Sequence, residues 1–311
     1  MSKINYHFFS YLVLFLTIIK ILFSLYYGDD LIDMEWRIIY ENLINFGEFS
    51  YHQIDGKRLS TVYMPPLYPY FLYSFSFLGL DQLITTKLIL SVQCILSSIS
   101  LFLFYKILTN FFGEQKSYFI AILYFIFPIN FYAASQISSV NIQVFCFICF
   151  IYSLLNLRTL KDYILLGLFS GLLILVRGEF WLLFFIVIFF KIFTKIKLVK
   201  NFLITFIVAL LVVSPVLFKN YKIFDQIVIT KSFGYNLWRG NSDDLNINGN
   251  FHEMKGLKED FIKSGENINK FDLYVDNFFL IKAKENLAEN PYKYAKHYLN
   301  KFFAFSSSAP R

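Results

Sequence analysis

The feature that most constrains this chain is a series of long apolar runs separated by short polar loops. Several of these runs exceed the roughly 10–14 residues of a helix buried in a soluble core, and the longest reach the ~20 residues that cross a bilayer. The runs cover residues 7–27, 88–105, 117–134, 139–157, 162–176, 179–194 and 202–218. They predict seven membrane-spanning helices, so we expect an all-α polytopic membrane protein.

The composition favours the same class. Apolar residues make up 57% of the 311 residues and charged residues make up 16%, whereas soluble domains have roughly 45–50% and about 25%. The net charge of +7 comes mainly from Lys and Arg in short clusters between the apolar runs. This is the positive-inside pattern of membrane proteins. We therefore expect contact with membrane lipids and exclude nucleic acid as a partner.

The basic clusters also orient the spans. Four lysines lie at residues 191–200, around one short loop, which predicts that this loop is cytoplasmic. Because successive loops alternate between faces, residues 28–87 and 219–311 then lie on the outer side. The expected domains are a membrane module at 1–218, with 28–87 as its first outer loop, and an extracytoplasmic segment at 219–311. The chain stops soon after an interfacial-looking stretch, so this segment can be truncated.

The first outer loop predicts two helices on the membrane surface. After Asp33, apolar residues recur at helical spacing as far as Gly47, which predicts a helix that ends there. Residues 65–80 have both ends on the outer face, which predicts an interfacial helix opened by two prolines. A short true span is the alternative, but it would reverse every later loop against the charge rule. Residues 290–305 are amphipathic and predict a further interfacial helix.

Acidic residues cluster in the stretch GDDLIDMEW, residues 28–36, where the first apolar run ends. Asp30 or Asp33 can cap the following helix, and the other acids can be solvated charges of an outer loop. Asp33 can instead accept a proton from a hydroxyl that attacks an electrophile. It can also hold a divalent cation, with Asp29 or Asp30 as a second ligand. Spacing alone leaves these roles open.

Several stretches resemble those of a known family. They are IDMEWRIIYENLINFGEFSY, STVYMPPLYPYFLY, LILVRGEFWLLF and SPVLFKNYKIFDQIVITKSFGYNLWRGNS, and together they cover most of residues 1–245. Their order and spacing resemble polytopic glycosyltransferases of the GT-C fold. The resemblance is to bacterial members of the dolichyl-phosphate-mannose protein mannosyltransferase and aminoarabinose-transferase type.

The resemblance implies a module of seven spans with two surface helices in the first outer loop. It also implies inverting transfer of a hexosyl or pentosyl group from a polyprenyl-phosphate-linked sugar. The acceptor would be a lipid, a glycan or a protein. The implied location is the bacterial inner membrane, with the active site on the outer face and a role in cell-envelope glycan biosynthesis.

The resemblance also implies candidate site residues. By position, Asp33 matches the family's loop aspartate as the catalytic residue, and Asp30 is the alternative register. Arg177 can hold the donor phosphate through two parallel hydrogen bonds, or it can snorkel or pair with Glu179. Lys20, about two turns below the outer end of the first span, can reach the same phosphate or snorkel instead.

The expected substrate-binding residues are Tyr63, Pro66, Tyr68, Tyr235 and Trp238. An interfacial aromatic belt explains the aromatic ones almost as well. The stretch FGYNLWRGN, residues 233–241, has two glycines that permit a tight turn, which would fold back over the site. The family's glutamate after the second outer loop is replaced by Asn141. A divalent metal is the one candidate cofactor, and this replacement removes one of its expected ligands.

Two other functions are compatible with a membrane protein of this kind. A transporter or lipid flippase is one, but its polar groups would be expected near the bilayer midplane and in paired repeats. In this chain the ionisable groups gather at one outer face and no second half mirrors the first. A non-catalytic or degenerate member that acts in envelope glycan assembly is the other. Asn141 and the abrupt C-terminus favour that alternative.

Overall fold

The computed structural model describes residues 6–194, 199–241 and 251–306. The chain is 78% helical with almost no sheet, which confirms the all-α polytopic class. The described residues pack into two compact units. Unit 1 comprises the residues up to Phe49 together with Pro65–Lys219, and unit 2 comprises Ser50–Met64 and the residues from Asn220 onward. Packing thus groups Ser50–Met64 with the C-terminal segment, although it lies within the first outer loop in the sequence.

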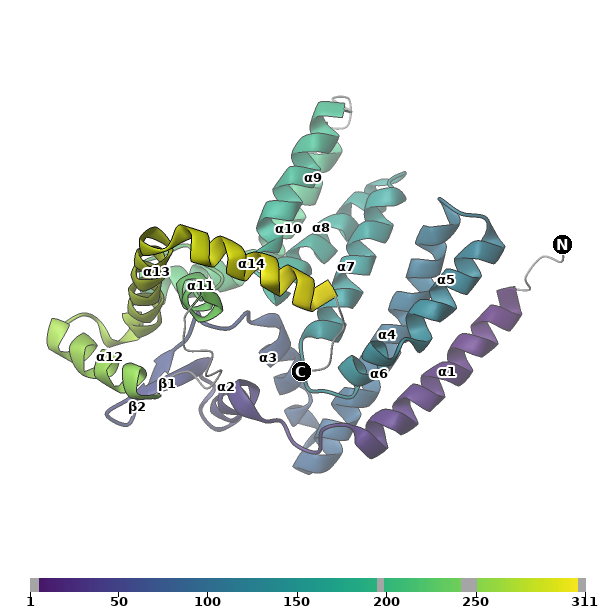
Figure 1. The fold of residues 1–311 in the computed structure, drawn as a ribbon. Helices are drawn as coiled ribbons and strands as arrows, with labels where there is room; N and C mark the ends of the chain where they lie inside the picture. Colours follow the sequence, from purple (N-terminus) through teal and green to yellow (C-terminus); the bar gives the residue numbers. More distant parts are fainter. Residues whose placement is uncertain (1–5, 195–198, 242–250, 307–311) are drawn as a thin grey trace. The chain divides into compact units, whose positions relative to one another are not determined.

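Each apolar run predicted to span the membrane is helical (Figure 1). The helices are α1 (Tyr6–Tyr27), α4 (Gln82–Thr109), α5 (Glu114–Ile126) with α6 (Pro128–Ala134), α7 (Val140–Leu155), α8 (Leu160–Val176), α9 (Phe180–Thr194) and α10 (Val199–Phe224). The third run is broken, because Pro128 cannot donate the next helical hydrogen bond. Helices α5 and α6 consequently meet at an angle of 54°.

Helix length limits how many of these helices cross a membrane unaided. Among the described residues, α1, α4 and α10 are long and apolar enough, and the bent pair α5–α6 makes a fourth if it counts as one span. Helices α7 and α9 are shorter apolar helices. The number of seven crossings therefore stays a prediction, whereas the helical state of each run is confirmed.

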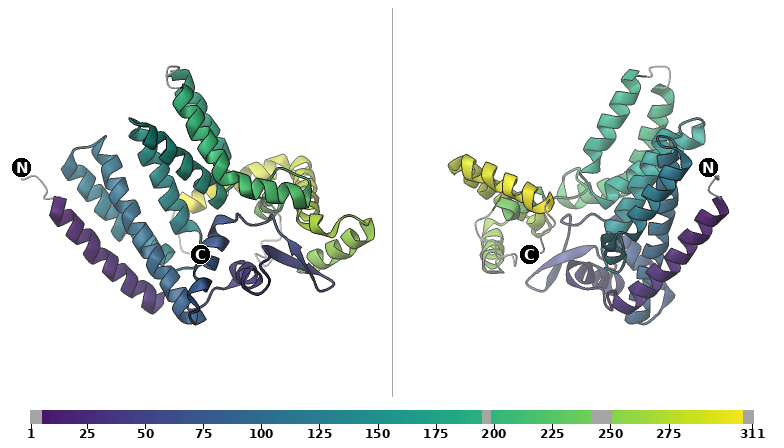
Figure 2. Two further views of the ribbon diagram at one scale, coloured as in Figure 1. Left: turned by 180° about the vertical axis from the view of Figure 1, so that it is seen from behind. Right: turned by 45° about the vertical axis from the view of Figure 1, so that its right-hand side comes forward.

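Helix α4 is the centre of unit 1. It contacts α1, α5 and α7, and α7 in turn contacts α8. Figures 1 and 2 show α1, α4, α5 and α7 running side by side. Phe9 of α1 is completely buried between α4 and α5, where its ring lies 4.4 Å from that of Tyr105 and 5.6 Å from that of Tyr118. These contacts fix one end of α1 against its neighbours.

The first outer loop contains both helices predicted from its sequence. Helix α2 (Met34–Phe46) ends at Gly47, whose φ of 67° is left-handed and whose N–H bonds to carbonyls of the last turn. Helix α3 (Leu67–Ser74) begins after Pro66. It is shorter than predicted, because a 3₁₀ turn at Ser76–Leu78 follows it. Helices α2 and α3 contact each other.

A β-hairpin, which was not predicted from the sequence, lies between these two helices in the chain. Strands β1 (Ser50–Ile54) and β2 (Lys57–Ser60) are antiparallel. Asp55 and Gly56 join them, with φ of 49° and 75°. An Asp-Gly pair with two positive φ values is the usual signal of a two-residue hairpin turn, so the sequence contained a cue for this element.

Unit 2 is built around α13 (Phe271–Glu289). This helix contacts α11 (Phe233–Asn241), α12 (Phe251–Ser264), the 3₁₀ turn Ile268–Lys270 and α14 (Pro291–Ser306). Side chains from the hairpin share its core, which contains Ile54, Leu59, Leu257, Phe261, Phe271, Val275 and Phe279. The helix predicted at residues 290–305 is confirmed as α14, and its interfacial position stays a prediction.

The tight turn predicted at residues 233–241 is wrong, because this segment forms the helix α11. Gly234 does have a structural role, but it concerns packing and not a turn. A Cβ on Gly234 would lie 2.1 Å from the main-chain carbonyl oxygen of Asp276. The missing side chain therefore lets α11 pass very close to α13.

Candidate functional site

The acidic stretch begins where α1 meets α4 and residues 135–138. A Cβ on Gly28 would lie 2.3 Å from the Ser24 carbonyl oxygen and 2.8 Å from that of Ser135, so only glycine fits there. The N–H of Asp29 donates to the Ser135 carbonyl at 3.0 Å. The Asp29 carboxylate accepts the N–H of Ile137 at 2.6 Å. Asp29 therefore joins the C-terminal end of α1 to residues 135–138 by hydrogen bonds.

Asp30 forms an ion pair with Lys87 of α4. The Lys87 ammonium lies 2.7 Å from the Asp30 carboxylate and also donates to the Gly28 carbonyl at 3.0 Å. The side chain of Asp30 is 73% exposed. Solvent weakens an ion pair at such a position, so we expect a small contribution to stability.

Asp33 occupies the N-cap position of α2. Its backbone is extended, with φ of −124°, and its side chain makes no capping hydrogen bond. Its main-chain carbonyl accepts the N–H of Arg37 at 3.3 Å. The carboxylate is exposed and has no hydrogen-bond or ion-pair partner among the residues that the structure describes. Of the three aspartates in the stretch, Asp33 thus has the carboxylate that is available to another molecule.

Tyr68 of α3 is buried beside this stretch, with 1% of its surface exposed. Its hydroxyl donates to Gln93 of α4 at 3.0 Å. Burial raises the pKa of Tyr68 well above its usual value, and the negative charge of Asp29 raises it further. The phenol therefore stays neutral at physiological pH and acts as a hydrogen-bond donor.

Further contacts tie Tyr68 to its surroundings. Gln93 is completely buried and donates to the Gln136 carbonyl at 2.9 Å. The ring of Trp36, in the first turn of α2, stands edge-on to Tyr68 at 4.8 Å. We call Asp29, Trp36, Tyr68 and Gln93 the Tyr68 cluster. It joins the end of α1 and the start of α2 to α3, α4 and residues 135–138. The backbone is thereby fixed on both sides of Asp33.

Arg177 ends helix α8. Its N–H donates to the Leu173 carbonyl at 3.0 Å, its backbone is extended, and its side chain is exposed. No ion pair with Glu179 or another acid is present among the described residues. Helix α8 contacts α3, the helix that carries Tyr68. The guanidinium is therefore available to an anion, and its role in holding the donor phosphate stays a prediction.

Lys20 is placed differently, because its side chain is completely buried within unit 1. Its ammonium donates to the Ser97 hydroxyl of α4 at 2.8 Å. It also lies over two aromatic rings, 4.4 Å from the centroid of Phe125 and 5.3 Å from that of Phe131. A donor phosphate would reach this group only if Lys20 left these partners.

The described residues do not fit a protein-built metal site. They contain no group of three or more His, Cys, Asp or Glu side chains that could hold a metal ion. The carboxylates of Asp29 and Asp30, the expected companions of Asp33, bond to Ile137 and Lys87. Asn141 is buried and donates its amide to the Ala133 carbonyl at 2.7 Å, so it links α6 to α7. We therefore derive no chemical step through a metal.

Unit 2 contains a second polar centre, which the sequence analysis missed. Asp272 and Asp276 lie one turn apart on α13, with only 4% and 2% of their surfaces exposed; we call them the aspartate pair. Residues four apart share one face of a helix. Two acids at this spacing in the largely apolar stretch FDLYVDNFF were the cue that could have revealed them.

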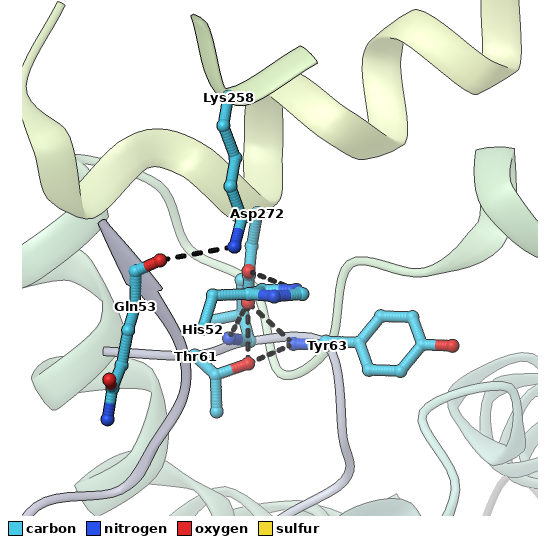
Figure 3. A network of polar contacts seen from close by, with 7 residues as sticks. His52, Gln53, Thr61, Tyr63, Lys258 and Asp272 are labelled. Carbon is cyan, nitrogen blue, oxygen red and sulfur yellow. Dashed lines mark hydrogen bonds and ion pairs between the residues drawn. The ribbon is translucent and has the colours of Figure 1, made fainter. Parts of the chain in front are cut away.

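Asp272 holds the chain that leads away from the hairpin. Its Oδ2 accepts the hydroxyl of Thr61 at 2.5 Å and the N–H groups of Val62 and Tyr63 at 2.9 and 3.2 Å (Figure 3). This carboxylate oxygen thus satisfies three donors from consecutive residues. The segment that carries Tyr63 is thereby fixed to α13.

Asp276 holds the start of α11 in the same way. Its Oδ1 accepts the N–H groups of Gly234 and Tyr235 at 2.6 and 3.2 Å. A carboxylate is favourable there, because the first N–H groups of a helix have no partner within it. The ammonium of Lys231 lies 4.0 Å from the other oxygen. The segment that carries Tyr235 is thereby also fixed to α13.

The aspartate pair places a group of aromatic rings. The rings of Tyr63 and Tyr235 meet at 5.8 Å with an interplanar angle of 73°. Tyr51 stacks on Tyr63 at 5.8 Å, and Trp238 lies 6.4 Å from Tyr235. We call these four residues the aromatic group. Three substrate-binding candidates, Tyr63, Tyr235 and Trp238, therefore come together in unit 2, whereas Pro66 and Tyr68 belong to unit 1.

His52 of β1 adjoins the same centre. Its Nε2 lies 3.6 Å from Oδ1 of Asp272 (Figure 3). Its ring stands edge-on to that of Phe271 at 5.3 Å. Burial lowers the pKa of His52 below its usual value. The charge of Asp272 opposes this shift, and that of Lys258 adds to it. Burial prevails, so His52 is neutral at physiological pH.

A comparison with protein families bears on unit 1. Residues 64–218 match the family model described as dolichyl-phosphate-mannose-protein mannosyltransferase. The matched region includes Tyr68, Gln93 and Arg177, whereas Asp33 and the aspartate pair lie outside it. No curated protein and no solved structure matches the chain.

Proposed function

Through residues 64–218 the chain belongs to the dolichyl-phosphate-mannose-protein mannosyltransferase family of membrane glycosyltransferases, and we propose that it transfers a sugar from a polyprenyl-phosphate donor to an acceptor hydroxyl. The family match carries this proposal. The acceptor hydroxyl would belong to a lipid, a glycan or a protein. The reaction would take place on the outer face of the membrane, which is the side that the basic loops predict for residues 28–87.

The proposed chemistry is a single displacement at the anomeric carbon. The acceptor oxygen attacks this carbon while its proton passes to the Asp33 carboxylate. The bond from the anomeric carbon to the phosphate oxygen breaks, and the phosphate keeps the electron pair. One displacement inverts the anomeric configuration. The phosphate leaves as an anion, so a second carboxylic acid of the kind used in glycoside hydrolysis is unnecessary.

The state of its carboxylate supports Asp33 as the base. Asp29 and Asp30 bond to Ile137 and Lys87, but the Asp33 carboxylate is exposed and makes no hydrogen bond or ion pair with the described chain. An exposed carboxylate of this kind can accept the proton of an acceptor hydroxyl. The Tyr68 cluster fixes the backbone around it, as a catalytic group requires.

Arg177 is the residue that we assign to the donor phosphate. A guanidinium can donate two parallel hydrogen bonds to a phosphate, and the bonds strengthen as negative charge develops on the leaving group. Its exposed position at the end of α8 suits a headgroup at the membrane surface, with the prenyl tail among the apolar helices. Lys20 is the second candidate for this role, but it would have to leave Ser97 to fill it.

The decisive experiment compares single substitutions in the full chain, reconstituted with a polyprenyl-phosphate-linked sugar donor and scored by sugar transfer. We expect Asp33→Asn to lower kcat by about 10²-fold or more, the usual range for loss of a general base. Asp81→Asn is the matched control, because Asp81 is also an exposed N-cap residue, at the start of α4. It should transfer sugar at the wild-type rate.

The outcomes separate the alternatives. Loss of transfer in Asp30→Asn, with normal transfer in Asp33→Asn, would move the role to Asp30. Normal transfer in both variants would remove the acidic stretch from the mechanism. Movement of labelled donor across the vesicle membrane without any transfer would favour a flippase and contradict the proposed function.

A further inference from the structure

We propose that Asp272 and Asp276 are paired positioning residues that hold the aromatic group as a binding site for a sugar ring of the acceptor. This inference rests on the proposed sugar transfer, because it assigns the acceptor side of that reaction to unit 2. It concerns the aspartate pair and aromatic rings outside 64–218, the region covered by the family match.

The hydrogen bonds show how the pair acts. Asp272 accepts the main-chain N–H of Tyr63 itself, and Asp276 accepts that of Tyr235 itself. The two carboxylates lie one turn apart on one face of the same helix. The backbones that carry both rings are therefore fixed to α13, although Tyr63 and Tyr235 are far apart in the sequence.

The free-energy cost of burying Asp272 and Asp276 indicates that these carboxylates are needed to fix the direction of main-chain N–H groups. Burying a carboxylate is unfavourable unless hydrogen bonds compensate it. Apolar side chains at positions 272 and 276 could pack in the core as their neighbours Phe271, Val275 and Phe279 do, but they would offer no acceptor to the main-chain donors. They would not fix the direction of the N–H groups of Tyr63 and Tyr235, which the carboxylates do.

The rings so placed have the chemistry that a sugar requires. A pyranose presents C–H groups on its faces and hydroxyls around its edge. Tyrosine and tryptophan offer an apolar face together with one polar group, and they lose little rotamer freedom on binding. Tyr51, Tyr63, Tyr235 and Trp238 are all partly exposed. These rings contact one another, and Tyr235 and Trp238 also pack against Phe279. A saccharide would therefore contact the ring surfaces that stay exposed.

Unit 2 suits the acceptor better than the donor tail. None of α11, α12, α13 and α14 is long and apolar enough to be a candidate membrane span. The prenyl chain of the donor needs an apolar environment, which the long helices of unit 1 provide. A water-exposed saccharide is therefore the part of the reaction that fits the aromatic group.

The test measures saccharide binding without any donor. Purified full-length protein in detergent is titrated with methyl glycosides of glucose, mannose, galactose and N-acetylglucosamine, and saturation-transfer NMR detects contact between sugar and aromatic protons. We expect saturation transfer to at least one glycoside. Binding should weaken about tenfold in Tyr235→Ala, the loss expected for one good ring contact.

The aspartates are tested by non-additivity. Asp276→Asn keeps an acceptor oxygen but removes the charge, and we expect binding roughly two- to fivefold weaker. In the Tyr235→Ala background the same substitution should change affinity less than about twofold, because Asp276 acts through the ring that is absent. Asp272→Asn should behave in the same way with Tyr63→Ala.

A matched control separates positioning from general loss of stability. Asn220 is buried, and its side-chain amide donates to the carbonyls of Val228 and Ile229. Asn220→Ala therefore removes buried hydrogen bonds between a side chain and the main chain that position no ring of the aromatic group. Its saccharide affinity should equal that of the wild type. Equal weakening in Asn220→Ala, or additive effects in the double variants, would overturn the positioning role.

Failure of this inference is distinguishable from failure of the proposed function. If no glycoside receives saturation transfer while the full chain still transfers sugar from its donor, the acceptor site lies elsewhere and the inference falls alone. If glycosides bind and Asp33→Asn transfers sugar normally, Asp33 is not the general base, but the saccharide site is supported.

Discussion

Units 1 and 2 each bury ionisable side chains, but these side chains have different kinds of bonding partner in the two units. In unit 1, Lys20 lies within α1 and bonds to the Ser97 hydroxyl and to two aromatic faces, all of which are neutral. In unit 2, the carboxylates of Asp272 and Asp276 accept main-chain N–H groups from two distant segments. The first arrangement joins helices, and the second fixes the direction of segments that carry aromatic rings.

The interface around Lys20 shows why the difference matters. Thr17, Lys20 and Ser24 lie on one face of α1, and each bonds to a polar side chain of α4. Side chains of this kind hold helices together in a membrane, where each contact contributes roughly 0.6 kcal/mol. One contact can be replaced without loss of the interface. The aspartate pair has no such redundancy, because each carboxylate satisfies several donors at once.

The largest effect that this comparison predicts is for Asp272→Ala. The substitution leaves the Thr61 hydroxyl and the Val62 N–H without their partner, at about 1–3 kcal/mol for each buried donor. The N–H of Tyr63 loses one of its two acceptors, because it also donates to the Thr61 hydroxyl oxygen at 3.1 Å. We expect unit 2 to be destabilised by about 3 kcal/mol or more. Hydrogen-exchange mass spectrometry should show loss of protection in the peptide that contains residues 61–63.

Asp260→Ala is the control for this prediction. Asp260 lies in the same unit, but its ion pair with Lys263 is exposed, with 64% of the aspartate side chain accessible. Loss of an exposed pair of this kind changes stability by less than about 1 kcal/mol. Comparable hydrogen exchange in the two variants would mean that the buried Asp272 contacts stabilise unit 2 no more than the exposed ion pair of Asp260 does.

The contrast between the units also explains what the sequence could and could not predict. The unit 1 helices were predictable, because each apolar run carries its own signal and the end of α2 is marked by Gly47. Asp33 was selected by position in the family pattern, and the structure adds that its carboxylate is unengaged within the described chain. The aspartate pair was not predictable in the same way, because Thr61 and Asp272 are separated by 211 positions.

Other failures had local causes. The glycines of FGYNLWRGN suggested a turn, but Gly234 is required by close packing of α11 on α13, which no local pattern reveals. The hairpin was overlooked although Asp55 and Gly56 carry its signal, because helical periodicity dominates the rest of the loop. Both failures fall in unit 2, where tertiary contacts outweigh local preference.

A change in pH should have an intermediate effect on the free energy of unfolding of unit 2, through His52. Above about pH 6.5 histidine is neutral in both the folded and the unfolded chain. Below that pH the unfolded chain binds a proton, whereas buried His52, whose pKa is lowered, resists it. The free energy of unfolding of unit 2 should therefore fall as pH decreases, by at most about 1.4 kcal/mol per pH unit and only down to the pKa of the folded state.

Urea unfolding of the full chain in detergent between about pH 7.5 and 5, which brackets the usual histidine pKa, would measure this slope. His52→Gln should lack it, because glutamine does not titrate. A free energy of unfolding that increases as pH falls would show that attraction to Asp272 outweighs burial, the reverse of the expected balance.

The smallest effect is expected for Lys20→Met, the change that tests the unit 1 half of the comparison. Methionine keeps the length of the side chain and fills irregular space well. The Ser97 hydroxyl can turn to its own helix backbone, and the lost cation–π contacts are offset by the removed cost of burying an ammonium. We expect thermal stability in detergent to change by no more than about 1 kcal/mol and the KM for a polyprenyl-phosphate-linked sugar to stay at the wild-type value.

Arg177→Met is the comparison variant, because it should raise that KM without affecting stability. A raised donor KM in Lys20→Met, with stability intact, would show that Lys20 leaves Ser97 to bind the phosphate, and its burial would then be a resting position and not its working one.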